Sequence, residues 1–552
     1  MSLPNFSAQS SLFSTAVLSG HLFPEDDRYR NFAQAVYPRL VAARLQLERC
    51  YCAENGRVAI EPVLMLGVSV LQFIDGLPDR AAVEMLRYHA GWNFALNRQL
   101  GDELFHPSSL VNFRARLIEG GLSSVGFETI LDGLVEAGLV ARRSQQRLDS
   151  TQIMGKISRM SRLECVRESL RLALKELEEL LGTESPRPPF WIEFWDRYVD
   201  SKLDYRAETS VLQGKMIQAG KDAARLLDWV KELASPQLSQ GEKLQLLQQV
   251  WKENFQVDTA GQLETTAAQP AGAVHNPHDP EAQWAAKGQG KHKKEHVGYK
   301  VQVAETVQTE TLQKGEPTPN FITAMVTQPA IASDEAGLVL VEKEQVQMAL
   351  EKPSHLYVDG AYISAAALAQ AQAEGQELIG PAQSAPKKEG RFSVENFQIN
   401  VQARKAICPA GKENMQCSRL EEGQSGKVSY RFEWGSHCHE CPLGQQCLGK
   451  DQRHRTVAVG EHHTHLQARR LEQQTQEFKE KARRRNAIEG TQSELVRAHG
   501  LRRARYCGLK KVRLQNYLAG AACNIKRWIR RKVWEINRAG RAAAVQEAMT
   551  MG

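Results

Sequence analysis

A short basic stretch in the last part of the sequence holds the residues best suited to chemistry. Between Lys481 and Arg497 the chain carries two acids, Glu489 and Glu494, among five lysines and arginines, in a run of good helix formers. Arg485 precedes Glu489 by about one helical turn, so both side chains would share one face of a helix. A carboxylate flanked by arginines is either a surface ion pair, which is the commoner case, or part of a site that handles a polyanion.

Two further acids, Asp149 and Asp359, lie in short β-like runs far upstream. Taken alone, Asp149 is better explained as a turn or cap residue, and Asp359 as part of an Asp-Gly turn. Three carboxylates from two strands and a helix, however, have the chemistry to hold two divalent metal ions over a phosphodiester, because Mg²⁺ and Mn²⁺ prefer carboxylate oxygen. Asp149, Asp359 and Glu489 are therefore the candidate ligands of a catalytic metal pair.

The elements that must position these acids are strands of one sheet. Alternating apolar and polar residues predict a strand, an insertion, then strand, strand, helix, strand, helix and strand, an order typical of an α/β domain with a mixed sheet. Acids on two strands of one sheet can converge at its edge. The strands are expected at 147–153, 296–307, 320–330, 354–364 and 376–382, and the helices at 334–351 and 365–375.

The composition and the distribution of charge indicate what kind of molecule the protein binds. The chain has 552 residues, 42% of them hydrophobic and 24% charged, which is ordinary for several globular domains. The net charge of +7 is uneven, since Lys481 to Lys532 alone contains 16 lysines and arginines against two acids. This density indicates nucleic acid or an anionic surface. No apolar run approaches the ~20 residues that span a bilayer, and the start lacks a secretory signal, so we expect a cytoplasmic, nucleoid-associated protein that does not bind membranes.

A basic belt follows Glu489 in the segment GLRRARYCGLKKVRLQ. Arginine forks match phosphates well, although a generic basic helix remains the alternative. Apolar residues at helical spacing beyond the belt should pack inward: Leu514, Leu518, Ala521, Ala522 and Ile525. The candidate DNA-binding residues are Arg485, Arg497, Arg502, Arg503, Arg505, Lys510, Lys511 and Arg513.

Five of the ten cysteines fall within 40 positions, between Cys408 and Cys447. In a reducing cytoplasm such clustering favours a metal site over a disulfide framework. Cys438 and Cys441 form a C-x-x-C pair, and two further cysteines complete a tetrahedral structural zinc site. The expected Zn²⁺ ligands are Cys408, Cys438, Cys441 and Cys447. Cys417, His437 and His439 are spare candidates, and unligated thiols are the alternative.

These pieces together resemble a bacterial insertion-sequence transposase of the DDE class, in the subgroup with a cysteine-rich insertion before the third acid. FPEDDRYRNFAQAVYPRL and the apolar segment after it resemble the family's N-terminal helical domain. RLDSTQI resembles the first catalytic strand and HLYVDGAYIS the second. RRRNAIEGTQSELVRAHGLRRARYCGLKKVRLQNYLAGAACNIKRW, the most specific piece, resembles the third acid with its basic tail.

The resemblance implies an RNase H-like catalytic core with the triad Asp149, Asp359 and Glu489. After the second acid the wider group tends to have a free position, a small residue and an aromatic, which Gly360-Ala361-Tyr362 fits. Arg485 keeps the arginine place before the third acid.

Two places around the third acid depart from the group's pattern. The tyrosine expected three positions before the arginine is Ala482, and the lysine expected seven positions after the glutamate is Val496. Arg497 stands next to Val496 and would hold the phosphate from a shifted register.

We therefore expect an α/β protein with an RNase H-like core, a helical insertion and a zinc-knuckle insertion, preceded by an all-α domain. The expected layout is a helix-turn-helix-like DNA-binding domain at 1–140, the core at 141–155 and 270–385, the helical insertion at 156–269, the cysteine-rich insertion at 386–455, and the catalytic helix with its basic tail at 456–540.

The implied function is metal-dependent DNA cleavage and strand transfer, with Mg²⁺ or Mn²⁺ in catalysis and Zn²⁺ as a structural ion. The implied partner is duplex DNA, as terminal inverted repeats and target, bound by a homodimer or a larger assembly. Two alternatives from other classes stay open: a catalytically inactive, transposase-derived DNA-binding protein, and an RNA-binding or RNA-cleaving protein.

Overall fold

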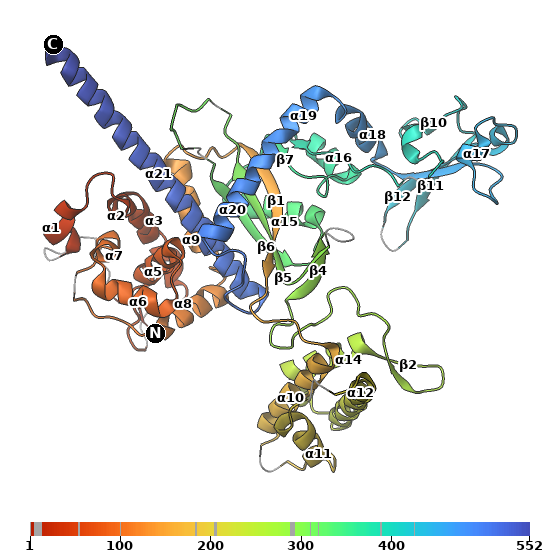
Figure 1. Cartoon of the computed structure of the whole chain (residues 1–552), viewed down its shortest axis with the longest axis horizontal. Helices are drawn as coiled ribbons and strands as arrows, with labels where there is room; N and C mark the ends of the chain where they lie inside the picture. Colours follow the sequence, from red (N-terminus) through yellow and green to blue (C-terminus); the bar gives the residue numbers. More distant parts are fainter. Residues whose placement is uncertain are drawn as a thin grey trace.

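The computed structural model describes residues 2–551, except 5–13, 53–55, 100, 183–184, 204–206, 288–292, 310, 318–319, 387–388 and 424–425. A six-stranded mixed sheet lies at the centre of the molecule (Figure 1), in the order β4-β5-β1-β7-β8, with β6 also paired to β5. The mixed α/β architecture predicted from the sequence is confirmed. The strands are β1 (Gln145–Met154), β4 (Gln283–Lys287), β5 (Lys294–Thr306), β6 (Ile322–Pro329), β7 (His355–Tyr357) and β8 (Glu377–Ile379).

Strand β1 lies between the antiparallel and the parallel half of the sheet. It pairs antiparallel with β5 and parallel with β7, and β7 pairs parallel with β8. Arg147 lies opposite Glu305 of β5. Because successive side chains of a strand point to opposite faces, Arg147 and Asp149 share one face and Leu148 lies on the other.

Different helices cover the two faces. On the face of Leu148, α15 (Asp334–Gln347) and α16 (Ala365–Ala373) bury Leu338 and Leu368. On the opposite face, Val301 and Met325 belong to one hydrophobic cluster with the N-terminal helices and with α21 (Leu509–Met551). The N-terminal helices and the sheet therefore share a core.

The N-terminal part is helical, as expected. No single helix among the described residues is long and apolar enough to cross a membrane; α5 and α6 reach that composition only together, and a bend of 105° separates them. The helices are α1 (Thr15–Ser19), α2 (Arg28–Asn31), α3 (Tyr37–Ala42), α4 (Arg44–Glu48), α5 (Pro62–Asp75), α6 (Asp79–Tyr88), α7 (Ala90–Ala95), α8 (Ser108–Glu119) and α9 (Val125–Glu136).

Helix α21 fits between the N-terminal helices and the sheet. A Cβ on Gly520 would lie 3.0 Å from Met325 of β6 and 3.1 Å from the ring of Phe127 of α9, so the glycine permits this close approach. The C-terminal half of the helix projects from the body (Figure 1) and is exposed. All five residues predicted to pack inward are buried: Leu514, Leu518, Ala521, Ala522 and Ile525.

The helical insertion forms a unit with its own core, set apart from the sheet (Figure 1). Phe190, Trp191 and Phe194 are buried in that core, and so is Cys165. A short hairpin that the sequence did not predict closes the unit, made by β2 (Phe255–Val257) and β3 (Leu263–Thr265). The helices are α10 (Arg162–Leu181), α11 (Trp191–Trp195), α12 (Thr209–Glu232), α13 (Pro236–Ser239) and α14 (Glu242–Asn254).

The cysteine-rich insertion is built from small antiparallel sheets around Phe397, Phe432 and Trp434. Its three-stranded sheet runs past the expected boundary at residue 455, because β13 pairs with β12. The strands are β9 (Gln398–Asn400), β10 (Lys405–Ile407), β11 (Gln416–Glu421), β12 (Val428–Glu433) and β13 (Thr456–Gly460). Helices α17 (Gly444–Cys447), α18 (His463–Glu472), α19 (Gln476–Ala482) and α20 (Ile488–Ala498) complete the region, with the 3₁₀ segment η7 (Arg483–Ala487) leading into α20.

Candidate active site

Asp149 lies in the middle of β1, on the sheet face that α20 contacts. Its side chain is only 9% exposed. Oδ1 accepts a hydrogen bond from the backbone N–H of Ser150 at 2.8 Å, and Oδ2 accepts one from Nη2 of Arg485 at 2.7 Å. Burial raises the pKa of Asp149, and the charge of Asp359 raises it further, while Arg485 and the Ser150 N–H lower it. A buried carboxylate in this position favours a cation beside it.

Asp359 follows β7, the parallel neighbour of β1. The parallel pairing of the two strands ends at Arg147 and Tyr357, so Asp149 and Asp359 each lie two residues beyond the last pair. Oδ1 of Asp359 accepts the N–H of Ala361 at 2.8 Å, so the residue does sit in a turn. Its Oδ2 lies 4.0 Å from Nη2 of Arg485, the same nitrogen that binds Asp149. One guanidinium therefore bridges the two aspartates.

A hollow of about 370 Å³ opens beside this bridge. Asp359 and Arg485 line one part of it, and Lys479 and Arg483, from α19 and η7, line another. Basic side chains next to a pair of carboxylates suit a phosphate group held beside bound cations.

Glu489 lies in the first turn of α20 and is exposed. One turn before it, Arg485 contacts Asp149; one turn after it, Gln492 donates to the backbone oxygen of Ser150 at 3.4 Å. Residues three and four positions apart lie on the same helix face, so Glu489 lies on the face of α20 that runs along β1.

The three acids are not equally close. Asp149 and Asp359 meet at Arg485, while Glu489 stands on the neighbouring helix. Among the described residues, the acids do not form a group whose ligand atoms all lie within 4.8 Å of one another. The group that does is a different one: Glu494, His499 and Cys523.

A buried ion network that the sequence reasoning missed fixes α20 to the sheet. Glu305 of β5 is fully buried and accepts from Arg147 Nε at 2.5 Å, Thr491 Oγ1 at 2.6 Å and Arg527 Nη1 at 3.1 Å. Arg527 of α21 also donates to Glu494 at 2.8 and 3.0 Å. The available sequence signal was a glutamate, Glu305, that takes the place of an apolar residue on the strand face of Val301 and Val303.

Comparison with known protein families adds two matches. Residues 407–529 match a family described as "Transposase DDE domain", and residues 19–116 match one described as "Transposase domain (DUF772)". Together they identify a DDE transposase. No curated protein and no solved structure matches the chain. The first match includes Glu489 of the transposase, whereas the strands that carry Asp149 and Asp359 lie outside both matches.

The basic belt of the transposase divides into exposed and internal residues. Arg505 is internal: its guanidinium lies 4.5 Å from the ring centroid of Phe73 and donates to the Leu77 carbonyl at 3.3 Å, so it joins the tail to the N-terminal helices. Arg485 is half-buried against Asp149. The other candidate DNA contacts have exposed side chains: Arg497, Arg502, Arg503, Lys510, Lys511 and Arg513.

The four predicted zinc ligands of the transposase line one small cavity, together with His437. They are Cys408, Cys438, Cys441 and Cys447. The backbone N–H of Arg455 donates to Sγ of Cys438 at 3.4 Å, as expected for a sulfur that carries negative charge when ligated. Four sulfurs are a donor set that suits tetrahedral zinc, but among the described residues no three of them have sulfur atoms all within 4.8 Å of one another.

Proposed function

We propose that the chain is a metal-dependent DNA transposase, which cleaves the ends of an insertion sequence and transfers them to target DNA. One observation carries this reading: Asp149 on β1 and Asp359, two residues after the parallel neighbour β7, both lie within 4.0 Å of the same guanidinium nitrogen of Arg485. The helix of Glu489 lies alongside, and the two transposase matches support the same function. The RNase H-like core belongs to the proposal, since Asp149 lies on β1 and Asp359 shortly after β7, its neighbour in a mixed sheet.

Asp149, Asp359 and Glu489 would hold Mg²⁺ or Mn²⁺. The fit rests on Arg485, because a cationic group lies between the two aspartates, and on the oxygen-only donor set, which hard cations prefer. When bound, two such ions activate a water or a DNA 3′-hydroxyl and stabilise the leaving oxygen.

The protein's own side chains bind and orient the DNA. Arg485 is positioned to neutralise a phosphate oxygen that enters between the acids, and Lys479 and Arg483 supply further positive charge in the adjoining hollow. Hydrolysis at an element end frees a 3′-hydroxyl, which then attacks target DNA. Because two ends must be held together for this transfer, we propose that at least two copies act on the DNA.

The test is nicking of a duplex that carries the inverted repeats flanking the coding region. The full chain should nick this duplex at the repeat boundary when Mn²⁺ is added, and should bind it with or without the ion. Binding without any nicking would leave only a DNA-binding protein. Preferential binding or cleavage of duplex RNA would point instead to an RNA enzyme.

In Arg485→Ala, the apparent affinity for Mn²⁺ should begin to fall at a higher pH than in the wild-type protein. Burial already holds the pKa of Asp149 above its usual range, and Arg485 lowers it, so loss of the guanidinium raises the pKa further. A proton competes with the metal for the carboxylate, so apparent Mn²⁺ affinity falls as pH drops through this pKa. Nicking titrated with Mn²⁺ from about pH 5 to about pH 8 measures the effect. Arg485→Lys, which keeps the charge, is the control; identical profiles for both variants would contradict the assignment.

Lys510→Ala combined with Lys511→Ala should weaken DNA binding and flatten its salt dependence. Both side chains are exposed on the first turn of α21. Each lost phosphate contact removes roughly 0.9 from the slope of log K against log salt, so the double variant should lose up to about 1.8. Lys243→Ala, in the helical insertion and paired with Glu242, is the control and should leave the slope unchanged. An unchanged slope in the double variant would remove both lysines from the interface.

We further propose that Cys408, Cys438, Cys441 and Cys447 bind a structural zinc ion. Because a small metal site contributes its binding energy to folding, Cys438→Ser with Cys441→Ser should loosen the insertion while sparing the sheet. Hydrogen exchange should speed up in residues 398–460 and stay unchanged in β1. Cys417→Ser is the matched control, since this residue lies on β11 opposite Phe432 and is not among the residues that line the cavity. Equal effects of both changes would argue against zinc.

A further inference from the structure

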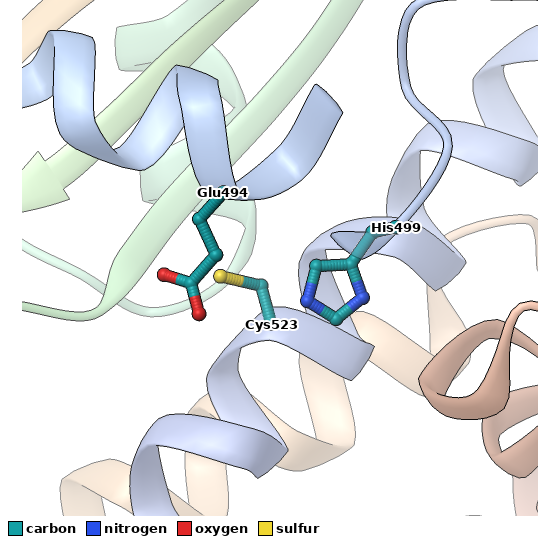
Figure 2. A group of neighbouring side chains, drawn as sticks. All are labelled: Glu494, His499 and Cys523. Carbon is teal, nitrogen blue, oxygen red and sulfur yellow. The ribbon is translucent and has the colours of Figure 1, made fainter. Parts of the chain in front are cut away.

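Three potential metal ligands from separate elements meet where α20 ends against α21. Glu494 belongs to α20, His499 is the residue that follows this helix, and Cys523 belongs to α21. One ligand atom from each lies within 4.8 Å of the others (Figure 2). His499 is 2% exposed and Cys523 is completely buried, while the Glu494 side chain keeps 20% of its surface exposed.

The imidazole of His499 has an available lone pair on the side that faces Cys523 (Figure 2). Its Nδ1 lies 3.4 Å from the backbone oxygen of Phe73. A carbonyl oxygen only accepts, so Nδ1 carries the proton and Nε2 is the bare nitrogen. Nε2 is buried and has no hydrogen-bond partner among the described residues. Figure 2 shows the ring with one nitrogen turned toward Cys523.

This arrangement is the one that metal-binding histidines usually have. A ligating imidazole typically donates its other N–H to a backbone carbonyl, which fixes the ring and its tautomer. Burial, the largest effect, and the charge of Lys526 lower the pKa of His499 to about 4, so the ring is neutral near pH 7. An orphaned, buried lone pair otherwise costs about 1–3 kcal/mol.

Glu494 retains capacity for a cation despite its arginine partners. Its Oε2 accepts hydrogen bonds from Nε and Nη2 of Arg527, and the Nη1 of the same guanidinium donates to Glu305. Its Oε1 is contacted by Arg530 at 3.3 Å, and the Arg530 side chain is 60% exposed and can move into solvent. A carboxylate oxygen offers two lone pairs, so this atom can serve a metal as well.

We propose that Glu494, His499 and Cys523 bind a zinc ion that joins the C-terminal end of α20 to α21. Thiolate and imidazole ligands select zinc over the magnesium or manganese expected at the aspartates. Binding forms the Zn–S bond as the thiol S–H bond breaks, and the proton passes to solvent. Through the Phe73 carbonyl, the same histidine connects the ion to α5 of the N-terminal helices. This site is independent of the cysteine-rich insertion and of the proposed activity.

Zinc content per chain tests the site. Full-length wild type, Cys523→Ser and Cys165→Ser would be purified in parallel, dialysed against metal-free buffer and analysed by mass spectrometry of the elements. Cys165 is the matched control, because it is an equally buried thiol, 1% exposed, in the helical insertion. Cys523→Ser should contain about one zinc ion fewer than wild type, and Cys165→Ser the same amount as wild type.

Equal zinc content in Cys523→Ser and wild type would overturn the proposal. If Cys523→Ser yields no folded protein, the variant in which Cys408, Cys438, Cys441 and Cys447 are all serine answers the same question. Retention of about one zinc ion by that variant supports the site, and complete loss of zinc overturns it. Addition of His499→Gln to the serine variant should then release the remaining ion.

Discussion

Asp149→Ala should abolish strand cleavage and leave DNA binding almost intact. The carboxylate lies at the meeting point of β1, β7 and α20, where its Oδ2 contacts Arg485 and would contact a metal ion. Loss of a ligand of the catalytic ions should slow cleavage by roughly a thousandfold or more, which corresponds to about 4 kcal/mol. Binding should hold or strengthen slightly, since one negative charge near the phosphates is removed. Nicking of repeat-end DNA and its equilibrium binding are the two measurements.

Asp132→Ala is the matched control for this variant. Asp132 lies on α9, and burial raises the pKa of its carboxyl too, but it is not among the residues of the acid cluster. Strand cleavage and DNA binding should both be unchanged in Asp132→Ala. If Asp149→Ala reduced binding and cleavage to the same extent, its effect would be a loss of folded protein, and its role as a metal ligand would have to be abandoned.

Glu305→Ala should destabilise the fold by about 3–5 kcal/mol, because removal of the shared carboxylate leaves buried arginines without a partner of opposite charge. Arg147 is 4% exposed and Arg527 is 11% exposed, and both lose their common carboxylate. Thr491 of α20 loses its acceptor in the same step. Urea unfolding measures the total effect, and hydrogen exchange in residues 483–498 should rise, because α20 is no longer held against the sheet.

The control for Glu305 is a surface pair on the same helix as Arg527. Glu535 binds Arg531 at 2.7 Å, and its side chain is 49% exposed. Glu535→Ala should therefore cost less than about 1 kcal/mol. A loss of similar size for Glu305→Ala would mean that the network adds nothing beyond an ordinary surface ion pair.

The order of the elements could be predicted because strand alternation and helical periodicity are local properties of the sequence. They located β1, β5, β6 and the five inward residues of α21. The sequence also predicted that Asp149 and Asp359 would lie near one another, and both lie within 4.0 Å of Arg485, while their role as metal ligands stays a prediction. Strand β4 and the β2–β3 hairpin were missed because they are short and depend on partners for their stability.

The details of the site could not be predicted, because they depend on contacts between residues far apart in the sequence. Arg485 was expected to hold a phosphate, yet its present partner is Asp149, more than three hundred positions away. Arg505 was grouped with the exposed bases, and only the packing of α5 beneath it shows its internal role. The Glu305 network and the Glu494–His499–Cys523 cluster likewise appear only when α20, α21 and the sheet are together. Periodicity carries no information on such partners.

The position of α21 has a consequence for how the protein is made. This helix covers a face of the sheet whose first strand, β1, leaves the ribosome long before it. Until the final helix emerges, that apolar surface has no permanent cover and is exposed to aggregation and to chaperones. Chains that are cut short before residue 509 should therefore be insoluble and degraded, so that folding of the sheet into a soluble protein depends on α21.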